Sequence, residues 1–139
     1  MENKTSGYSH TPLAKKLGIK EGHTALFINK PAHYFDLFSD FPKNITIVKG
    51  AKEGEIDFIH LFVKTVEEME DRIIHAKPLL KKDGLIWVSW PKGASKIKTD
   101  LKRDYIREFI LAIGLVDVKV CSVDGDWSGL KFVYRLTDR

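Results

Sequence analysis

The segment Glu55–Trp90, EIDFIHLFVKTVEEMEDRIIHAKPLLKKDGLIWVSW, decides the fold. It opens with a nearly continuous apolar run, which is typical of a strand with both faces covered, and such strands are usually parallel. Thr65 and Glu68 then form a T-x-x-E capping box, and apolar residues recur at helical spacing up to Pro78. A second apolar strand follows Gly84. This order predicts a parallel strand–helix–strand unit.

Further elements are predicted on both sides of this unit. On the N-terminal side we expect a short helix that Thr11 caps, with Pro12 as its first residue and Gly18 as its end. The other elements that the patterns predict are a strand over 23–29, a helix over 30–42, a strand over 44–50, a helix over 100–114 and an antiparallel strand pair over 115–124 and 129–136.

Bulk composition is that of an ordinary globular protein. The chain has 139 residues, 43% of them hydrophobic and 30% charged, which suits one domain over 1–139 with residues 1–22 as an N-terminal arm and short helix. The opening residues are polar and no apolar run approaches the roughly 20 residues that span a bilayer, so we expect no signal peptide and no membrane segment. The single Cys121 allows no internal disulfide, and we expect a cytoplasmic protein.

The order of elements after Glu55 resembles the second half of class I S-adenosylmethionine-dependent methyltransferases. The segments that carry this resemblance are the strand with Asp57, the run PLLKKDGLIWVSW, the next helix, and the closing antiparallel pair, which together span 55–136. The fold class that the resemblance implies is α/β, a three-layer α-β-α sandwich of a reduced Rossmann or methyltransferase-like kind. Its sheet is expected to be mostly parallel, with a C-terminal antiparallel pair.

The first half departs from that superfamily at the cofactor loop. The turn after the first strand, FINKPAHYF, contains no glycine, although glycines are what let a backbone approach a cofactor closely. Pro31 also removes an amide donor, and Lys49 stands where an acidic residue would bind the ribose. We therefore predict no cofactor and do not expect S-adenosylmethionine to bind.

Several segments are similar to a small bacterial family of unknown function, the one labelled domain of unknown function 3052. They are GYSHTPLAKKLGIKEG, HLFVKT, WVSWPKGAS, GLVDVKVCSVD and WSGLKFVYR, and they are spread over nearly the full length. The resemblance implies a stand-alone soluble domain and supplies no established activity or catalytic residue.

A candidate site lies at the carboxyl ends of the strands, where open α/β sheets bind ligands. Basic residues concentrate there: the run from Pro91 to Arg107 holds six Lys or Arg against two Asp, a balance of +4 that equals the net charge of the chain. We expect an anion to bind there, and the alternative is a plain connection whose lysines face water. The predicted ligand-binding residues are Asn29, Lys30, His33, Lys92, Ser95, Lys96, Ser128 and Lys131.

Other chemistry has little support in the sequence. No histidine pair has metal-ligand spacing, His60 lies in an apolar strand, and Ser89 is not in a nucleophile elbow, so we predict no metal and no catalytic residue. Nucleic acid is also not expected, because it would need exposed aromatic residues among basic strands, whereas the lysines lie on a predicted helix and its leading loop. The expected function is a non-catalytic domain that binds an anionic small molecule or an acidic partner. Two alternatives remain open: a divergent methyltransferase, and a homodimer formed through an exposed edge strand over 129–136.

Overall fold

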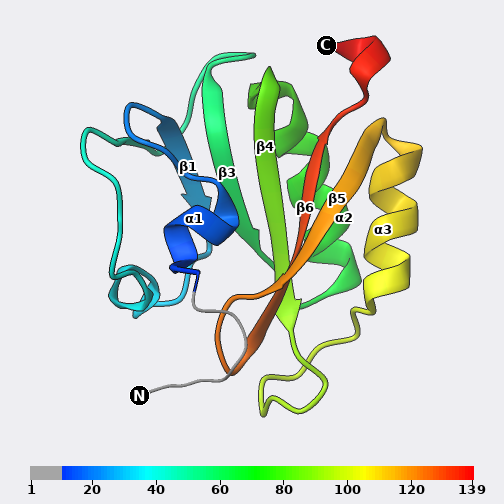
Figure 1. Cartoon of the computed structure of the whole chain (residues 1–139). Helices are drawn as coiled ribbons and strands as arrows, with labels where there is room; N and C mark the ends of the chain where they lie inside the picture. Colours follow the sequence, from blue (N-terminus) through cyan, green and yellow to red (C-terminus); the bar gives the residue numbers. More distant parts are fainter. Residues whose placement is uncertain (1–10) are drawn as a thin grey trace.

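A computed structural model of the chain describes residues 11–139. One six-stranded sheet, ordered β2-β1-β3-β4-β6-β5, forms its centre (Figure 1). The first four strands along the chain pair in parallel, and β6 is antiparallel to both of its neighbours. The strands are β1 (Thr24–Ile28), β2 (Thr46–Val48), β3 (Ile56–Phe62), β4 (Leu80–Pro91), β5 (Leu115–Ser122) and β6 (Trp127–Tyr134). This arrangement confirms the predicted mostly parallel sheet with its C-terminal antiparallel pair.

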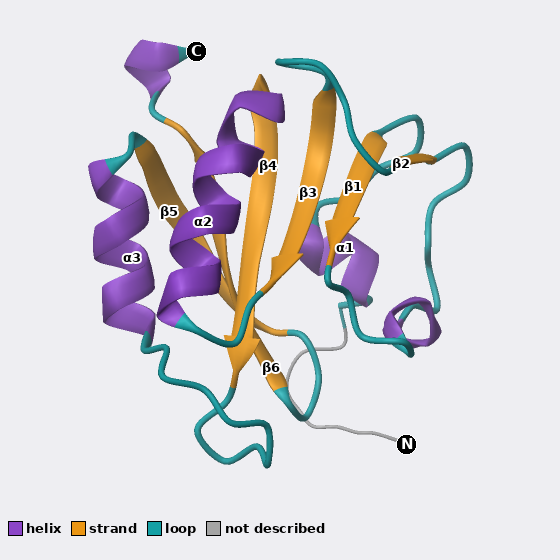
Figure 2. Cartoon of the chain, turned by 180° about the vertical axis from the view of Figure 1, so that it is seen from behind, coloured by secondary structure: helices purple, strands orange, loops and turns teal. Residues whose placement is uncertain are grey.

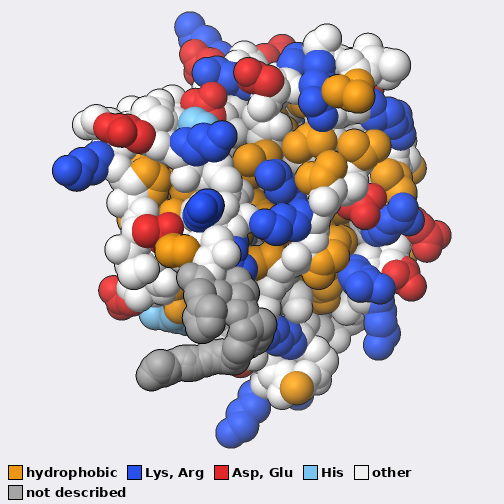
Figure 3. All heavy atoms as spheres, in the orientation of Figure 1, with side chains coloured by type: hydrophobic (Ala, Val, Ile, Leu, Met, Phe, Trp, Pro, Cys, Tyr) orange, Lys and Arg blue, Asp and Glu red, His pale blue; other side chains and the backbone are white. Residues whose placement is uncertain are grey.

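Helices cover both faces of the sheet, as the predicted three-layer sandwich requires. The helical elements are α1 (Leu13–Leu17), α2 (Val66–Ala76), α3 (Arg103–Ala112) and three 3₁₀ turns, η1 (Tyr34–Leu37), η2 (Lys77–Leu79) and η3 (Leu136–Asp138). α2 and α3 lie side by side on one face, whereas α1 lies on the other (Figure 2). On the α1 face, no helix of residues 11–139 lies over β6 and β5, and hydrophobic side chains mixed with Lys and Arg cover the surface there (Figure 3).

The predicted strand–helix unit forms the centre of the core. Every residue of β3 except Asp57 is buried, and α2 and α3 contribute the fully buried Met69, Ile73, Ile106 and Ile110 to the same cluster. α2 begins as predicted, because the Glu68 amide donates to the Thr65 hydroxyl at 3.1 Å. The Glu68 carboxylate does not return to Thr65, however, and accepts instead from the Lys64 amide at 2.9 Å.

The start of α1 differs from the prediction. Pro12 is the residue before the helix rather than its first residue. The first-turn amides of Ala14 and Lys15 donate to the carboxylate of Asp40, at 3.1 and 3.3 Å. Gly18 ends the helix as predicted, in the left-handed region with φ of 81°. The predicted residues before Thr11 lie outside the described part of the chain.

The helix predicted over 30–42 is wrong, because only the single turn η1 forms there. The apolar residues of this segment are aromatic, and they pack on one another instead of forming the stripe of a long helix. The Tyr34 ring lies 5.2 Å from the rings of both Phe27 and Phe38, and Phe35 contacts Phe41 at 5.3 Å. Ring–ring contacts of this kind stabilise an irregular segment without backbone periodicity.

The edge of the sheet also differs from the prediction. β6, which includes most of the segment predicted to be an exposed edge, pairs with β4 on one side and β5 on the other. Because its backbone groups are already paired, β6 does not provide the exposed edge that the predicted homodimer would use. β5 is the edge strand, and an irregularity between Asp117 and Lys119 disturbs its alternation. On this strand, Val118 and Val120 are 53% and 56% exposed.

Candidate functional site

The carboxyl ends of β1, β3 and β4 point to the same end of the sheet, the lower end in Figure 2. The loops that follow β1, β3 and β4, together with the β5–β6 turn, surround this end. Most of the predicted site residues lie in these loops, but the structure divides them between separate places. Asn29, Lys30 and His33 follow β1, while Lys92, Ser95 and Lys96 follow β4.

Lys131 does not belong to this end, contrary to the prediction. Lys131 lies within β6, where it pairs with Trp87 of β4. It lines a pocket of about 200 Å³ together with Gly18, His23 and Asp57. Antiparallel β6 runs away from the carboxyl end of β4, and each residue along it adds about 3.4 Å. Ser128 pairs with Trp90 and does lie near that end, beside the start of α3.

A glutamate bridges the crevice between β1 and β3, where the strand order reverses. Asn29 adopts a left-handed conformation with φ of 59°, which is where the chain turns away from β1. Its side-chain amide donates to Glu68 Oε2 at 3.3 Å, and Glu68 Oε1 accepts from the Lys64 amide at 2.9 Å. Glu68 thereby ties the loop after β1 to the loop after β3.

A second contact joins the loop after β1 to the β5–β6 turn. His33 Nε2 lies 2.8 Å from Asp124 Oδ2, and Asp124 Oδ1 accepts from the amides of Asp126 and Trp127 at 2.8 and 2.9 Å. Burial alone would raise the pKa of the Asp124 carboxyl, but these hydrogen bonds outweigh burial and lower it. The β5–β6 turn is thus held by the Asp124 carboxylate.

Aromatic rings fill the space beneath these two contacts. Tyr34, Phe62 and Trp127 are at most 5% exposed and form one cluster with Val123. The rings of Phe62 and Trp127 meet edge to face with centroids 5.0 Å apart. Below the rim, therefore, this part of the molecule is packed with side chains.

A buried polar chain connects the cluster to the sheet. The Tyr34 hydroxyl lies 2.9 Å from His60 Nδ1, and His60 Nε2 lies 2.8 Å from the Ser89 hydroxyl; all three residues are fully buried. Burial lowers the pKa of His60 to about 3, so the ring is neutral, with one nitrogen donating and the other accepting. His60, which the sequence places in an apolar strand, is thus buried and makes two side-chain hydrogen bonds. Because no solvent reaches Ser89, we interpret the chain as structural.

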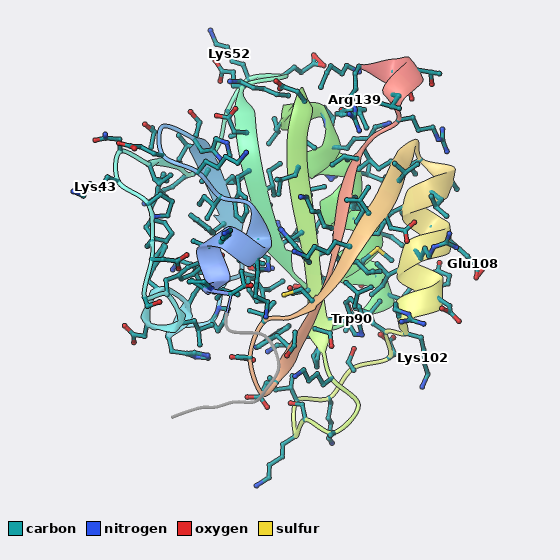
Figure 4. The ribbon with its side chains drawn as sticks, viewed as in Figure 1. Lys43, Lys52, Trp90, Lys102, Glu108 and Arg139 are labelled. Carbon is teal, nitrogen blue, oxygen red and sulfur yellow. The ribbon has the colours of Figure 1, made fainter. Side chains whose placement is uncertain are left out.

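A basic pocket of about 460 Å³ lies in the loop after β4. Its lining includes five cationic side chains and no carboxylate: Lys92, Lys96, Lys98, Lys102 and Arg103. Trp90 and Lys102 lie near the two ends of this loop (Figure 4). Asp100, the acidic residue of the loop, is turned away and accepts from the Val66 amide of α2 at 2.8 Å.

The basic and polar residues of this pocket differ in whether their side chains already have hydrogen-bond partners. Lys92 Nζ donates to the Ser122 hydroxyl at 2.6 Å, and the Ser95 hydroxyl donates to Asp126 at 2.8 Å. Lys96, Lys98 and Lys102 have no ion-pair or hydrogen-bond partner for their ammonium groups within residues 11–139. The site prediction omitted Lys98, Lys102 and Arg103, although all three belong to the basic run whose charge pointed to this loop.

Within 11–139, no three His, Cys, Asp or Glu side chains are grouped so that they could hold a metal ion. No helix of that part of the chain is long and apolar enough to cross a membrane.

Comparison with solved structures identifies the fold. A S-adenosylmethionine-dependent methyltransferase from Aquifex aeolicus superposes with a TM-score of 0.61 at 13% identity, covering 86% of each chain. A putative type 11 methyltransferase from Sulfolobus solfataricus gives a TM-score of 0.62 at 11% identity, covering 91% of this chain and 92% of that one. Aeropyrum pernix fibrillarin, solved with natively bound S-adenosyl-L-methionine, gives 0.58 at 15% identity, covering 87% and 73%. At these identities the likeness shows the methyltransferase fold alone, and no family model or curated protein matches the chain.

The residues at the carboxyl ends of β1 and β2 differ from the glycine loop and acidic residue expected of a methyltransferase cofactor site. Asn29, rather than a glycine, makes the left-handed turn after β1, and its side chain closes on Glu68. Lys49 follows β2 in place of an acidic ribose ligand, and the buried rings of Tyr34 and Trp127 occupy the interior below the rim. The chain has the sheet of the methyltransferase fold, and the turn after β1 contains no glycine.

Proposed function

We propose that this chain is a non-catalytic binding domain whose basic pocket, lined by residues 92–103, takes an anionic small molecule. The observation that carries the proposal is the pocket of about 460 Å³ with five cationic side chains and no carboxylate in its lining. Phosphate and carboxylate groups are the ligands that such a set of donors binds best.

The surroundings of the pocket support this proposal. α3 begins at Arg103 without a side-chain cap, so its first amides and its dipole add to the positive potential of the lysines. The lone nearby ion pair, Arg103 with Asp104 at 3.8 Å, is exposed and weak. Lys92 and Ser95 tie the loop to the end of β5 and to the β5–β6 turn, which fixes the position of this side of the pocket.

Titration calorimetry with inorganic phosphate, pyrophosphate and ATP tests the proposal. We expect pyrophosphate or ATP to bind with an affinity that falls as salt rises, and Lys98→Ser/Lys102→Ser to weaken binding at least about tenfold. The matched control is Lys43→Ser/Lys52→Ser, which removes two exposed lysines outside the pocket lining (Figure 4). Absence of heat with all three anions, or equal weakening by both variants, contradicts the proposal.

The fold favours a second candidate, a divergent methyltransferase that binds its cofactor without the glycine loop. Calorimetry with S-adenosylmethionine and S-adenosylhomocysteine separates the candidates, since we expect no heat from either compound at millimolar concentration. Saturable binding that Glu68→Ala strengthens would favour the methyltransferase, because that substitution opens the crevice after β1.

Two finer inferences accompany the proposal. We infer membership of the family labelled domain of unknown function 3052 from the segments that resemble it, and solving another member with the same bridged crevice would support this. We also infer a cytoplasmic location, which suits a chain whose one cysteine, Cys121, is a free thiol.

A further inference from the structure

The α2–α3 face of the sheet is only partly covered by helices. α2 packs against β3 and α3 packs against β5, but no helix of residues 11–139 lies over β1 and β2 on this face (Figure 2). The uncovered strands lie beside α2, where a third helix would continue the layer. The proposed anion pocket does not account for this uncovered part of the sheet.

The gap is a groove of about 540 Å³ with an apolar floor. Leu26 and Ile28 alternate along β1, and Leu26 pairs in register with Val48 of β2, so the three side chains share one face. Ala76 and Leu79 form the wall on the side of α2 and η2. Leu26 and Ala76 belong to the main core, and the other three pack against it, so the groove is an unfinished edge of that core.

Positive charge surrounds this apolar floor. Lys30, Lys49, Arg72 and His75 line the groove, and no Asp or Glu does. Lys49 and Arg72 have no ion-pair or hydrogen-bond partner for their side chains within the described residues. His75 alone has a nearby carboxylate, since its Nδ1 lies 3.5 Å from Asp71 Oδ1.

We propose that this groove binds an amphipathic helix of a partner protein whose apolar face is flanked by Asp and Glu. A helix fits because it can lie beside α2 at the usual interhelical spacing of about 8–10 Å and place side chains one turn apart on the floor. Acidic flanks fit because Lys49 and Arg72 are unpaired cations at its borders. A second copy of the chain fits less well, because each copy carries a net charge of +4.

A display library of stapled helical peptides, randomised on every face, tests the proposal against the full chain. We expect the enriched peptides to share an apolar stripe with acidic flanks. Their affinity should fall roughly tenfold or more in Lys49→Glu/Arg72→Glu and stay unchanged in the matched control Lys43→Glu/Lys52→Glu. Peptides with lysine flanks should bind the Lys49→Glu/Arg72→Glu variant better than the wild type. All four substituted residues are exposed, so both variants are expected to fold.

Backbone amide shifts on titration with the best peptide locate its site. Shifts confined to β1, β2 and α2, retained in Lys98→Ser/Lys102→Ser, support the groove and separate it from the anion pocket. The proposal is overturned if no helical pattern is enriched, if the peptides bind both Glu variants equally, or if the shifts map to residues 92–103. It is also overturned if light scattering shows a dimer whose interface shifts cover the groove, since a second copy would then be the occupant.

Discussion

The imidazole of His33 lies 2.8 Å from the Asp124 carboxylate, across 91 positions of sequence, and joins the loop after β1 to the β5–β6 turn. The two partners differ in exposure, with 50% of the His33 side chain and 12% of the Asp124 side chain accessible. Asp124 also accepts two backbone hydrogen bonds, whereas this contact is the one made by the His33 ring among the described residues. We therefore expect Asp124, the more buried partner, to contribute more to stability than His33 does.

We predict that Asp124→Ala lowers the free energy of unfolding by about 1–3 kcal/mol, because it leaves the Asp126 and Trp127 amides without their acceptor. His33→Ala should cost less, about 0.2–1 kcal/mol, since its ring is half exposed. Urea unfolding at pH 7 measures both. Equal effects of the two substitutions would show that the contact itself, rather than the turn, is what stabilises.

The same carboxylate predicts an acid dependence. The pKa of Asp124 is lower in the folded chain than its ordinary value of about 3.9, so the unfolded chain binds the proton first. The stabilisation is present above that ordinary value and is lost as pH falls through the folded pKa. Asp124→Asn should therefore have a lower free energy of unfolding than wild type at pH 6, and this difference should disappear toward pH 2.

A close approach at Gly84 gives a prediction with an internal control. A Cβ atom there would lie 2.9 Å from the Asp57 carbonyl oxygen and 2.9 Å from Leu80 Cδ1, where β3 passes β4. We expect Gly84→Ala to lower the free energy of unfolding by about 1–3 kcal/mol, because the backbone oxygen cannot move without breaking the sheet. Gly93→Ala meets nothing within 4 Å and should change stability by less than about 0.5 kcal/mol. Similar urea midpoints for the two variants would contradict the prediction.

Local patterns in the sequence predict the fold well, and long-range contacts explain where they fail. The apolar run of β3 and the capping of α2 by Thr65 depend on neighbouring residues, so periodicity and spacing reveal them. The carboxylates of Asp40 and Asp100, which accept from the first amides of α1 and α2, come from 26 and 34 positions away and have no local signature.

The candidate site was predicted in part for the same reason. The charge of the run after Trp90 is a local property, and Lys92, Lys96, Lys98 and Lys102 of this run line one pocket in the structure. Placing Lys131 required the register of β6 against β4, which alternation alone does not supply. The hydrogen bond from Asn29 to Glu68 could not be predicted either, because it joins two loops whose contact has no local signature in the sequence.

The single cysteine gives a direct probe of local stability. Cys121 is 7% exposed on the edge strand β5, and burial raises the pKa of its thiol against the smaller opposing effects of Lys16, Lys119 and Lys92. Each unit of increase lowers the reactive thiolate about tenfold at a given pH. We expect slow reaction with a disulfide reagent at pH 8 that accelerates across the urea transition, and none in Cys121→Ser. Equal rates in native and unfolded protein would show that β5 opens freely.

His60 predicts the pH dependence of the whole domain. Burial lowers its pKa to about 3 in the folded chain, against an ordinary value of about 6.5, so between these values the unfolded chain binds a proton that the folded chain does not. Stability should therefore fall as pH falls, by up to about 1.4 kcal/mol for each pH unit below 6.5.

The comparison that isolates His60 is His60→Gln, which can still hydrogen-bond to Tyr34 and Ser89 but does not titrate. The other four histidines, His10, His23, His33 and His75, are present in both proteins, so their contributions cancel in the difference. We expect urea unfolding between pH 7 and pH 4.5 to show a steeper loss in wild type than in His60→Gln. Parallel curves would mean that the ring takes up its proton inside the folded protein. The hydrogen-bonded side chains of Tyr34, His60 and Ser89 would then be accessible to water and could take part in a reaction.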